Sequence, residues 1–415
     1  MDDTGENRLA LGPYRVLDLT DENGMLCGRI LGDLGADVIK VEKPGGDEAR
    51  NIGPFYQDVA HPERSLHWFA YNANKRGVTL NLQVEEGREI FQKLVKTSHF
   101  VIESFAPGYL EELGLSYSIL SQTNPAIIMV SITPFGQSGP NKNYKSSDIV
   151  AMAMGGLMYT TGDPDRPPVR VSVEQSYLHA GAQAAVGALI AHWYRETTGK
   201  GQQVDISMQE AVIPSIPEML PYWQFAQYKL VRSGSYIFRG RAWQRVAWPC
   251  KDGQIGMRIL TGVYARAIIP LIEWMDEEGM AGNLKDINWK EMDVSKIGQE
   301  EYDSWEEQFI HFFLSHTKEE LYREALKRHI HLLPAYTTDE LVKEKQLTSR
   351  DYWTEVAHPE LGTSITYPGP FARLNLTPYQ IRQRAPLIGE HNHEVYRELG
   401  ITTEKLASLE RANVI

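Results

Sequence analysis

The feature of the sequence that most constrains its fold is a strand–helix–strand succession near its start. A short apolar segment, YRVLDL at 14–19, precedes the helix-like GMLCGRILGDLGA and a second apolar segment, DVIKVE at 37–42. Two parallel strands joined by a helix form a βαβ unit, whose sheet is buried on both faces. Further strand-like segments follow in GVTLNL at 77–82, HFVIESF at 99–105 and AIIMVSI at 126–132. We therefore predict an α/β fold with a parallel sheet covered by helices.

The composition indicates a soluble globular enzyme and not a nucleic-acid-binding protein. Of the 415 residues, 42% are hydrophobic and 23% are charged, which are ordinary values for a folded enzyme. Acidic residues number 54 against 42 basic ones, and the net charge of -12 repels phosphate backbones. Cys27 and Cys250 provide neither a disulfide framework nor a metal cluster, and the first residues carry no secretory signal. We therefore expect a cytoplasmic protein that binds neither nucleic acid nor a membrane.

Turn and proline signals divide the chain into parts. The charge-free stretch at 175–194 contains histidine and glutamine among small residues, so a buried helix is predicted in preference to a membrane span. Three prolines between 214 and 221 then interrupt the chain, and Asp252-Gly253 marks a β-hairpin further on. The predicted parts are a large domain at 1–215, a smaller α+β domain at 216–330, and a linker with a return to the large domain at 331–415.

Taken alone, the short motifs assign no chemistry. Neither of the glycine-rich phosphate loops, G-x-G-x-x-G and G-x-x-x-x-G-K-[ST], occurs. His391 and His393 lack further ligands at metal-site spacing, so we predict no metal site and favour capping or surface roles. Lys75 and Arg76 could clamp a phosphate, but solvated charge is the more ordinary explanation. Carboxylates near tight turns could be nucleophiles or bases, although turn formation is favoured. These are Asp148, Asp163, Asp165 and Glu174.

Longer segments resemble the family III CoA-transferases over nearly the whole chain. They include LGDLGADVIKVEKPGGD, YNANKRGVTLNL, VIESFAPGYLEELGL, SITPFGQSGP, GGLMYTTGDPDRPPVRV and RAPLIGEHN. The resemblance implies a Rossmann-like large domain built from both chain ends, a small domain inserted between them, and two subunits interlocked like linked rings. It also implies that CoA and its thioesters are substrates and that no cofactor is tightly bound.

The position of the family's nucleophile is the main departure from this resemblance. In the family, an aspartate four residues before the glycine matched by Gly181 attacks the acyl-CoA thioester and forms an acyl-enzyme anhydride. Tyr177 stands at that position here. A phenol, with a reference pKa near ~10, is protonated at neutral pH and cannot form the anhydride. Glu174, nearly one helical turn earlier, is a substitute nucleophile to be weighed against a structural role, which we favour.

Six residues match the CoA-binding positions that the resemblance implies. They are Asn23, Gly24, Lys43, Leu80, Ser104 and Phe105, all expected on loops or strand ends. The flexible ammonium group of Lys43 suits a phosphate, and a merely solvated lysine is the alternative. Two further departures are Ser104, where the family has asparagine, and Glu112, where it has a basic residue.

Without the nucleophile, the chain resembles the partner subunit of a heteromeric transferase. The segments ESF, NANKRG and LHAG are most similar to aspartate-lacking subunits that, with a homologous aspartate-bearing chain, move CoA from succinyl-CoA to (R)-benzylsuccinate in anaerobic toluene degradation. Two alternatives stay open. A CoA-ester racemase would need a histidine before the pair matched by Asp148-Ile149, where Ser147 stands. A non-catalytic scaffold subunit would only complete the dimer.

Overall fold

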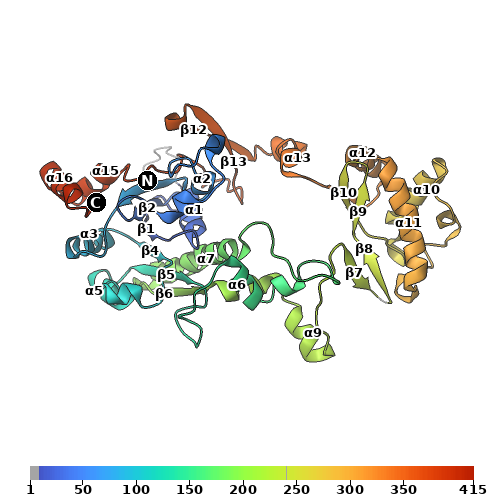
Figure 1. Cartoon of the computed structure of the whole chain (residues 1–415), viewed down its shortest axis with the longest axis horizontal. Helices are drawn as coiled ribbons and strands as arrows, with labels where there is room; N and C mark the ends of the chain where they lie inside the picture. Colours follow the sequence, from blue (N-terminus) through green and yellow to red (C-terminus); the bar gives the residue numbers. More distant parts are fainter. Residues whose placement is uncertain (1–8, 240) are drawn as a thin grey trace. The chain divides into compact units, whose positions relative to one another are not determined.

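A computed structural model of the chain describes residues 9–239 and 241–415 (Figure 1). The chain divides into two compact units. Of the described residues, the first unit combines those up to 158 with 171–226 and 347–415, and the second combines those in 159–170 and 227–346. The first unit is therefore built from both ends of the chain. The domain limits inferred from the sequence, at 215/216 and 330/331, stay a prediction, whereas the compact units change at 226/227 and 346/347.

A six-stranded parallel sheet forms the centre of the first unit and confirms the predicted α/β fold. Its order is β3-β2-β1-β4-β5-β6. The strands are β1 (Arg15–Leu19), β2 (Asp37–Glu42), β3 (Lys75–Thr79), β4 (Phe100–Glu103), β5 (Ile128–Thr133) and β6 (Gln203–Ser207). Strands β1, β2, β4 and β5 are buried along nearly their whole length, because helices cover both faces of the sheet. We predicted a strand at 77–82. The observed strand, β3, begins two residues earlier, at Lys75, and ends at Thr79.

Different helices cover the two faces of this sheet. One face packs against α1 (Met25–Asp33) and α7 (Gln175–Thr198), and the other packs against α3 (Glu85–Lys96), α5 (Tyr117–Thr123) and the C-terminal helices α15 (Asn392–Glu398) and α16 (Thr403–Arg411). The remaining helices of this unit are α2 (Leu66–Asn72), α4 (Tyr109–Glu112), α6 (Asp148–Met154), α8 (Met208–Val212) and α9 (Met219–Ala226). The hairpin β12 (Trp353–His358) and β13 (Thr363–Pro368) lies beside α2 in the same core cluster, and α14 (Lys345–Ser349) spans the change of unit.

Helix α7 corrects part of the prediction for residues 175–194. The helix is present, and its small residues Ala180, Ala184 and Ala188 are buried in one core cluster with residues of α1 and the sheet. The opposite face is not buried: the exposed fractions are 57% for Val186, 65% for Ile190 and 73% for Trp193. The helix we expected to be buried is thus buried on one side only, because small residues pack on one face and large apolar ones project from the other. None of the helices in the described ranges is long and apolar enough to cross a membrane.

The second unit is a smaller α+β structure. Strands β9 (Ala247–Cys250) and β10 (Gly253–Met257) form the antiparallel hairpin predicted at Asp252-Gly253, and β11 (Leu332–Ala335) pairs with β10. An aromatic core that includes Trp248, Trp305 and Phe309 lies between these strands and the helices. The other elements are β7 (Tyr236–Arg239), β8 (Ala242–Arg245), α10 (Ile269–Glu277), α11 (Gln299–Ser315), α12 (Lys318–Arg328) and α13 (Thr338–Val342).

The C-terminal segment closes the exposed edge of the large sheet at β3. The backbone N–H of Thr79 donates to Asn392 Oδ1 at 2.8 Å, and the Tyr396 hydroxyl donates to the Thr79 carbonyl at 2.6 Å. His391 exchanges hydrogen bonds with the backbone of Gly77: its own N–H donates to the Gly77 carbonyl, and its Nδ1 accepts from the Gly77 N–H. His391, one of the two histidines considered as metal ligands, is therefore hydrogen-bonded to the backbone of the edge strand β3.

This closure predicts the effect of removing one hydroxyl group. Tyr396→Phe should lower the free energy of unfolding by about 1–2 kcal/mol, because the buried Thr79 carbonyl loses a donor. The measurement is the urea midpoint of the purified protein. Tyr144→Phe, which removes a hydroxyl from an exposed tyrosine, is the matched control and should leave the midpoint unchanged. Equal shifts in both variants would contradict the role of this contact.

Candidate active-site cleft

The largest sheet places a cleft where parallel sheets commonly bind ligands. The strand order reverses between β1 and β4, so the loops that follow these two strands diverge and leave a crevice at their carboxyl ends. A cleft of about 440 Å³ lies there, lined by residues at and beyond the ends of β1, β2, β3 and β4. The sheet topology thus fixes the position of a candidate active site within the first unit.

Four of the six residues predicted to bind CoA line this cleft. Lys43 follows β2, Leu80 follows β3, and Ser104 and Phe105 follow β4. The other two, Asn23 and Gly24, are not among the lining residues. Asn23 donates through its side chain to Asp21 Oδ1 at 2.7 Å. A Cβ at Gly24 would lie 2.7 Å from Thr20 Cγ2, so both residues shape the loop between β1 and α1.

Carboxylates outnumber cations at the cleft. Its lining includes five carboxylic side chains, Asp21, Glu22, Glu42, Asp47 and Glu48, beside Lys43. Glu42 is neutralised by a buried, bidentate ion pair with Arg50 at 2.7 and 2.8 Å. Lys43 pairs with Glu48, which raises the Lys43 pKa, and both side chains are largely exposed. Because exposed ion pairs contribute little to stability, Lys43 can exchange Glu48 for another anion.

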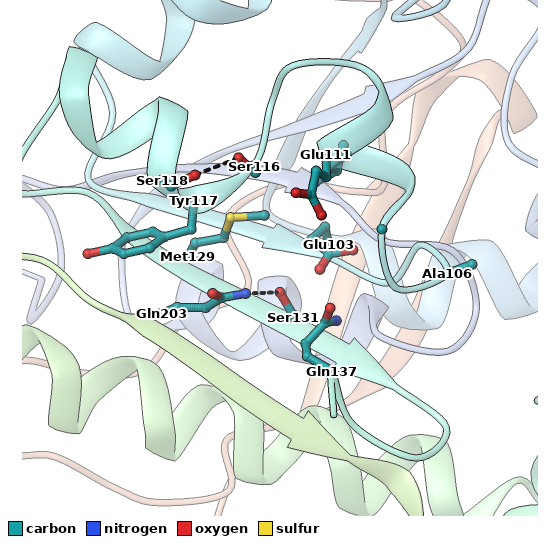
Figure 2. A pocket seen from close by; sticks show the side chains of 12 residues that line it. Glu103, Ala106, Glu111, Ser116, Tyr117, Ser118, Met129, Ser131, Gln137 and Gln203 are labelled. Atoms are coloured by element: carbon teal, nitrogen blue, oxygen red, sulfur yellow. Dashed lines mark hydrogen bonds between the residues drawn. The ribbon is translucent and has the colours of Figure 1, made fainter. Parts of the chain in front are cut away.

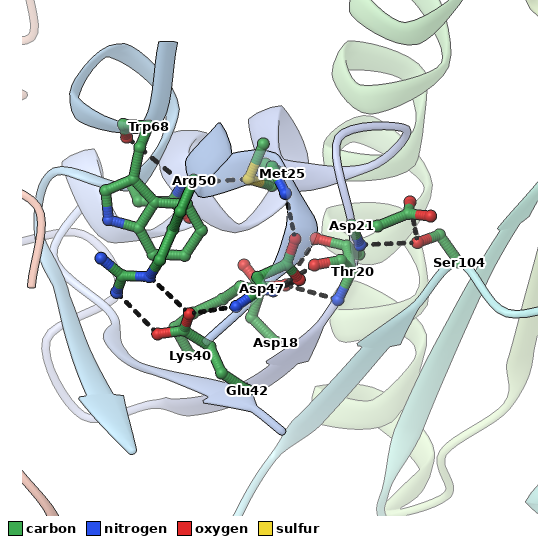
Figure 3. A network of polar contacts seen from close by, with 12 residues as sticks. Asp18, Thr20, Asp21, Met25, Lys40, Glu42, Asp47, Arg50, Trp68 and Ser104 are labelled. Atoms are coloured by element: carbon green, nitrogen blue, oxygen red, sulfur yellow. Dashed lines mark hydrogen bonds and ion pairs between the residues drawn. The ribbon is translucent and has the colours of Figure 1, made fainter. Parts of the chain in front are cut away.

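A buried ionic cluster, drawn in Figure 3, adjoins the cleft through Asp47, which lines the cleft and lies 3.8 Å from Lys40 Nζ. Asp18 on β1 accepts a hydrogen bond from Lys75 Nζ at 2.7 Å and lies 3.8 Å from Lys40 Nζ, and all three side chains are fully buried. Asp18 also accepts from the Thr20 hydroxyl at 2.6 Å and the Thr20 N–H at 3.0 Å, while Lys40 donates to the Thr20 carbonyl. Burial alone would raise the Asp18 pKa, but the two lysines lower it, so the cluster holds a carboxylate.

Lys75 is thereby excluded from the phosphate-binding role that we weighed for it. Its ammonium group donates to Asp18, to the Met25 carbonyl at 3.0 Å and to Asn72 Oδ1 at 2.9 Å, so all three of its donors are used inside the protein. Its neighbour Arg76 forms ion pairs with Asp37 and with Glu394 and Glu398 of α15. The pair of basic residues therefore joins elements of the fold and does not face the cleft.

A hydrogen-bonded latch connects the two diverging loops of the cleft. The backbone N–H of Asp21 donates to Ser104 Oγ at 2.9 Å, and the Ser104 hydroxyl donates to Asp21 Oδ1 at 2.7 Å (Figure 3). Ser104 is therefore fixed by both of its hydrogen-bonding functions. The serine that replaces the family's asparagine serves here to hold the loop after β1 against the loop after β4.

Tyr177 is engaged at the start of α7. Its hydroxyl oxygen accepts the backbone N–H of Asp148 at 3.0 Å, and Asp148 Oδ1 accepts the N–H and the hydroxyl of Ser176, both at 2.8 Å. Burial first, and then nearby Glu22 and Asp148, raise the pKa of Tyr177 to about 12. Tyr177 is therefore a neutral phenol at physiological pH. Asp148 caps the start of α7, which agrees with the structural role favoured for it.

The other candidate carboxylates are not among the residues that line the cleft. Glu174 is exposed and is the residue that immediately precedes α7. Burial lowers the pKa of His67 and raises that of Tyr71, both on α2, and the nearby Glu174 charge acts to raise the pKa of each. Asp163 and Asp165 belong to the second unit. The structure therefore brings together the strand-end residues predicted for the cleft, and Glu174 of the same unit is not one of them.

Sequence analysis missed the charged residues that organise the cleft. Asp18 and Lys40 were counted as parts of apolar strands, although each is a charged residue within an otherwise apolar run, in VLDL and VIKVE. A charge within a strand buried on both faces requires a partner, and that signal was present in the sequence. Asp21, whose latch with Ser104 depends on long-range folding, left no comparable signal.

Comparison with known proteins identifies the family. The family model described as CoA-transferase family III matches residues 11–392. The BbsE subunit of succinyl-CoA:(R)-benzylsuccinate CoA-transferase from Thauera aromatica is 34% identical over 97% of this chain and 97% of that protein. Succinyl-CoA–D-citramalate CoA-transferase from Chloroflexus aurantiacus is 32% identical over 98% of each. The chain belongs to the family III CoA-transferases.

A solved structure and two paired subunits extend this comparison. A CaiB/BaiF family protein from Brucella suis superposes with a TM-score of 0.83 at 26% identity, covering 95% of this chain and 100% of that one. The alpha and beta subunits of succinyl-CoA–L-malate CoA-transferase from Chloroflexus aurantiacus are 30% and 29% identical to the chain. These alignments cover 99% and 98% of this chain, and 94% and 98% of the alpha and beta subunits. The two subunits of one enzyme therefore both resemble the chain.

Helix α1 approaches the ionic cluster so closely that we predict Gly28 cannot be replaced by a larger residue without loss of stability. A Cβ at Gly28 would lie 2.1 Å from Asp18 Oδ2 and 3.2 Å from Lys75 Nζ. Gly28→Ala should therefore separate the buried ion pair and cost about 3 kcal/mol or more. Thermal unfolding is the measurement. Gly298→Ala, at a position where an added Cβ meets nothing within 4 Å, is the control and should leave the unfolding temperature nearly unchanged.

Proposed function

We propose that this chain is the aspartate-lacking subunit of a heteromeric CoA-transferase. The reaction would move CoA from an acyl-CoA such as succinyl-CoA to a carboxylic acid such as (R)-benzylsuccinate, and a homologous chain would supply the catalytic aspartate. The observation that carries the proposal is Tyr177, a neutral phenol hydrogen-bonded to Asp148 at the position matched to the family's nucleophile. The similarity to the BbsE subunit supports the substrates named here.

The different chemistry of an aspartate and of Tyr177 supports the assignment of catalysis to the partner chain and not to this one. An aspartate carboxylate that attacks a thioester forms an anhydride and releases CoA thiolate, which can attack the new enzyme carbonyl and release the acyl group as a carboxylate. A phenol would instead form an aryl ester after losing its proton. With the pKa of Tyr177 raised to about 12, the phenolate is scarce at neutral pH. Tyr177 therefore supports a binding or structural role and not a nucleophilic one.

The cleft supports a role in holding the CoA thioester. All four lining residues receive a role. Lys43 would bind a phosphate, and Leu80 and Phe105 would make apolar contact with the ligand. Ser104 would hold the loop after β4 in place. Asn23 and Gly24 would act through the shape of the loop after β1. The acidic lining makes Lys43 the cation on which a phosphate in this cleft would depend.

The exposed face of α7 supports a partner chain. Val186, Ile190 and Trp193 present large apolar side chains to solvent on one side of the helix. Monomeric soluble proteins rarely leave such contiguous patches uncovered. Two family members form the subunits of the malate enzyme, and the BbsE protein is itself named as a subunit. A homologous transferase chain is thus the partner proposed, in a heterodimer or heterotetramer whose subunits interlock. A cytoplasmic location accords with the free thiols of Cys27 and Cys250.

The two alternatives differ in what they require of the site. A racemase would use a histidine beside Asp148, but Ser147 precedes it and the Asp148 carboxylate is already bonded to Ser176. A scaffold subunit would keep the fold without binding CoA, and the surplus of carboxylates at the cleft favours it over the racemase. Titration of the assembled protein with CoA separates the scaffold from the proposed subunit. Binding that is weakened by Lys43→Ala would place CoA in this chain's cleft and favour the subunit, whereas binding that Lys43→Ala leaves unchanged would favour the scaffold.

The proposal predicts dependence on co-expression. The chain alone should show no transfer between succinyl-CoA and dicarboxylates, whereas co-expression with an aspartate-bearing homologue should give an active one-to-one assembly. Chains that thread through each other form their interface during folding, so mixing the two after separate purification should restore little activity. Size-exclusion chromatography with mass analysis and a transferase assay test all three statements. Robust turnover by the single chain would overturn the proposal, and Glu174→Gln would then show whether Glu174 is the nucleophile.

Restoring the family residue should not by itself restore catalysis. Tyr177→Asp in the chain alone is expected to give little or no transfer, because the shorter side chain loses the contact with the Asp148 N–H and adds a carboxylate beside Asp148 and Glu22. Ser104 and Glu112 also differ from the family pattern. The assay measures succinyl-CoA consumption, with Tyr177→Phe as the control. Activity of Tyr177→Asp at the level of the co-expressed enzyme would contradict this expectation.

A further inference from the structure

Glu103 lies at the junction of the candidate cleft and a second hollow. It is the last residue of β4, and the next two residues, Ser104 and Phe105, line the cleft. On its other side is a hollow of about 290 Å³ over β4, β5 and β6, into which the Glu103 carboxyl group points (Figure 2). Glu103 is nevertheless 4% exposed as a whole residue. A buried acid that the proposed chemistry does not use therefore stands directly behind the cleft loop.

Hydrogen bonds connect this carboxyl group to the loop that lines the cleft. Glu103 Oε2 accepts the backbone N–H of Phe105 at 2.8 Å. The Ser131 side chain on β5 also hydrogen-bonds to Glu103, and Ser131 Oγ accepts Gln203 Nε2 of β6 at 3.3 Å. The carboxylate is thus oriented by Ser131 of β5, which Gln203 of β6 contacts in turn, and it holds the backbone N–H of Phe105. An ionised acceptor makes this N–H bond roughly twice as strong as a neutral one would.

The surroundings of Glu103 disfavour its charge. The pKa of Glu103 is raised to about 7, and burial is the largest cause. The hydrogen bonds from Ser131 and the Phe105 N–H oppose this rise, and the charges of Asp205 on β6 and Asp21 after β1 add to it by smaller amounts. Glu111 on α4 faces the same hollow (Figure 2), and the described residues that line it include no lysine, arginine or histidine. The carboxyl group therefore changes charge near neutral pH. Above that pH it is the stronger acceptor for Phe105.

We infer that Glu103 is a positioning residue for the ligand in the cleft, because its carboxylate holds the backbone that places Phe105 and the latched Ser104. This inference rests on the proposed function, which assigns the cleft to a CoA thioester. Glu103 lies behind the loop and does not line the cleft, so it acts on binding through Phe105. Protonation weakens the Glu103–Phe105 bond and loosens the wall of the cleft.

The inference predicts a specific split between binding and turnover. In the co-expressed enzyme, the KM for acyl-CoA should rise several-fold as the pH falls from 8 to 6, with kcat changed much less by this group. Glu103→Gln, which keeps the shape but removes the charge, should show a raised KM that no longer varies with this titration. Glu111→Gln lines the same hollow but has no bond to the loop, so its pH profile should follow the wild type.

A measurement without ligand separates failure of this inference from failure of the proposed function. Hydrogen exchange of the Phe105 amide, expressed as protection relative to the free peptide at each pH, should fall in Glu103→Gln and in the wild type below pH 7. Unchanged protection in both, or a wild-type KM profile in Glu103→Gln, overturns the inference. If protection behaves as expected but CoA binds at no pH, the loop-fixing role of Glu103 stands and the assignment of the cleft to CoA fails. Should Glu103→Gln not fold, the wild-type pH series alone decides between these results.

Discussion

The candidate cleft depends on the buried contact between Asp18 and Lys75. Three parallel strands meet at this point: Asp18 comes from β1, Lys40 from β2 and Lys75 from β3, and none of the three side chains is exposed to solvent. An isolated buried charge would cost several kcal/mol, but here the lysine donors are met by Asp18, backbone carbonyls and Asn72. The geometry of the loop after β1 is therefore fixed by the contacts of Asp18 and Lys40 with Thr20, independently of any ligand.

The latch and Glu103 add constraints from the opposite side of the cleft. Ser104 ties the loop after β4 to the loop after β1, and Glu103 fixes the next turn of backbone through Phe105. The two walls are thus connected to each other as well as to the sheet. A cleft built this way has few independent parts, and the buried charges Asp18, Lys40 and Glu103 each adjoin a residue that lines it.

The sequence predicts the sheet and several strand ends, because apolar periodicity and turn residues are local. It places Lys43, Leu80, Ser104 and Phe105 correctly at the ends of strands, and the structure brings them into one cleft. It does not predict that one face of α7 is exposed, because apolar composition alone does not say which side is covered. The contact of Tyr396 with Thr79 spans 317 residues, and no local pattern encodes such a pairing.

The closure of β3 by the C-terminal segment has a consequence for the order of events during synthesis. Thr79 leaves the ribosome 313 residues before Asn392, its partner. At typical rates of translation this interval is roughly 15–60 seconds. During that time the free edge of β3 lacks the groups that later satisfy it, and unpaired strand edges attract other chains. The segment around Asn392 therefore ends a period of exposure of this edge, and the partner chain that we propose would have that period in which to engage it.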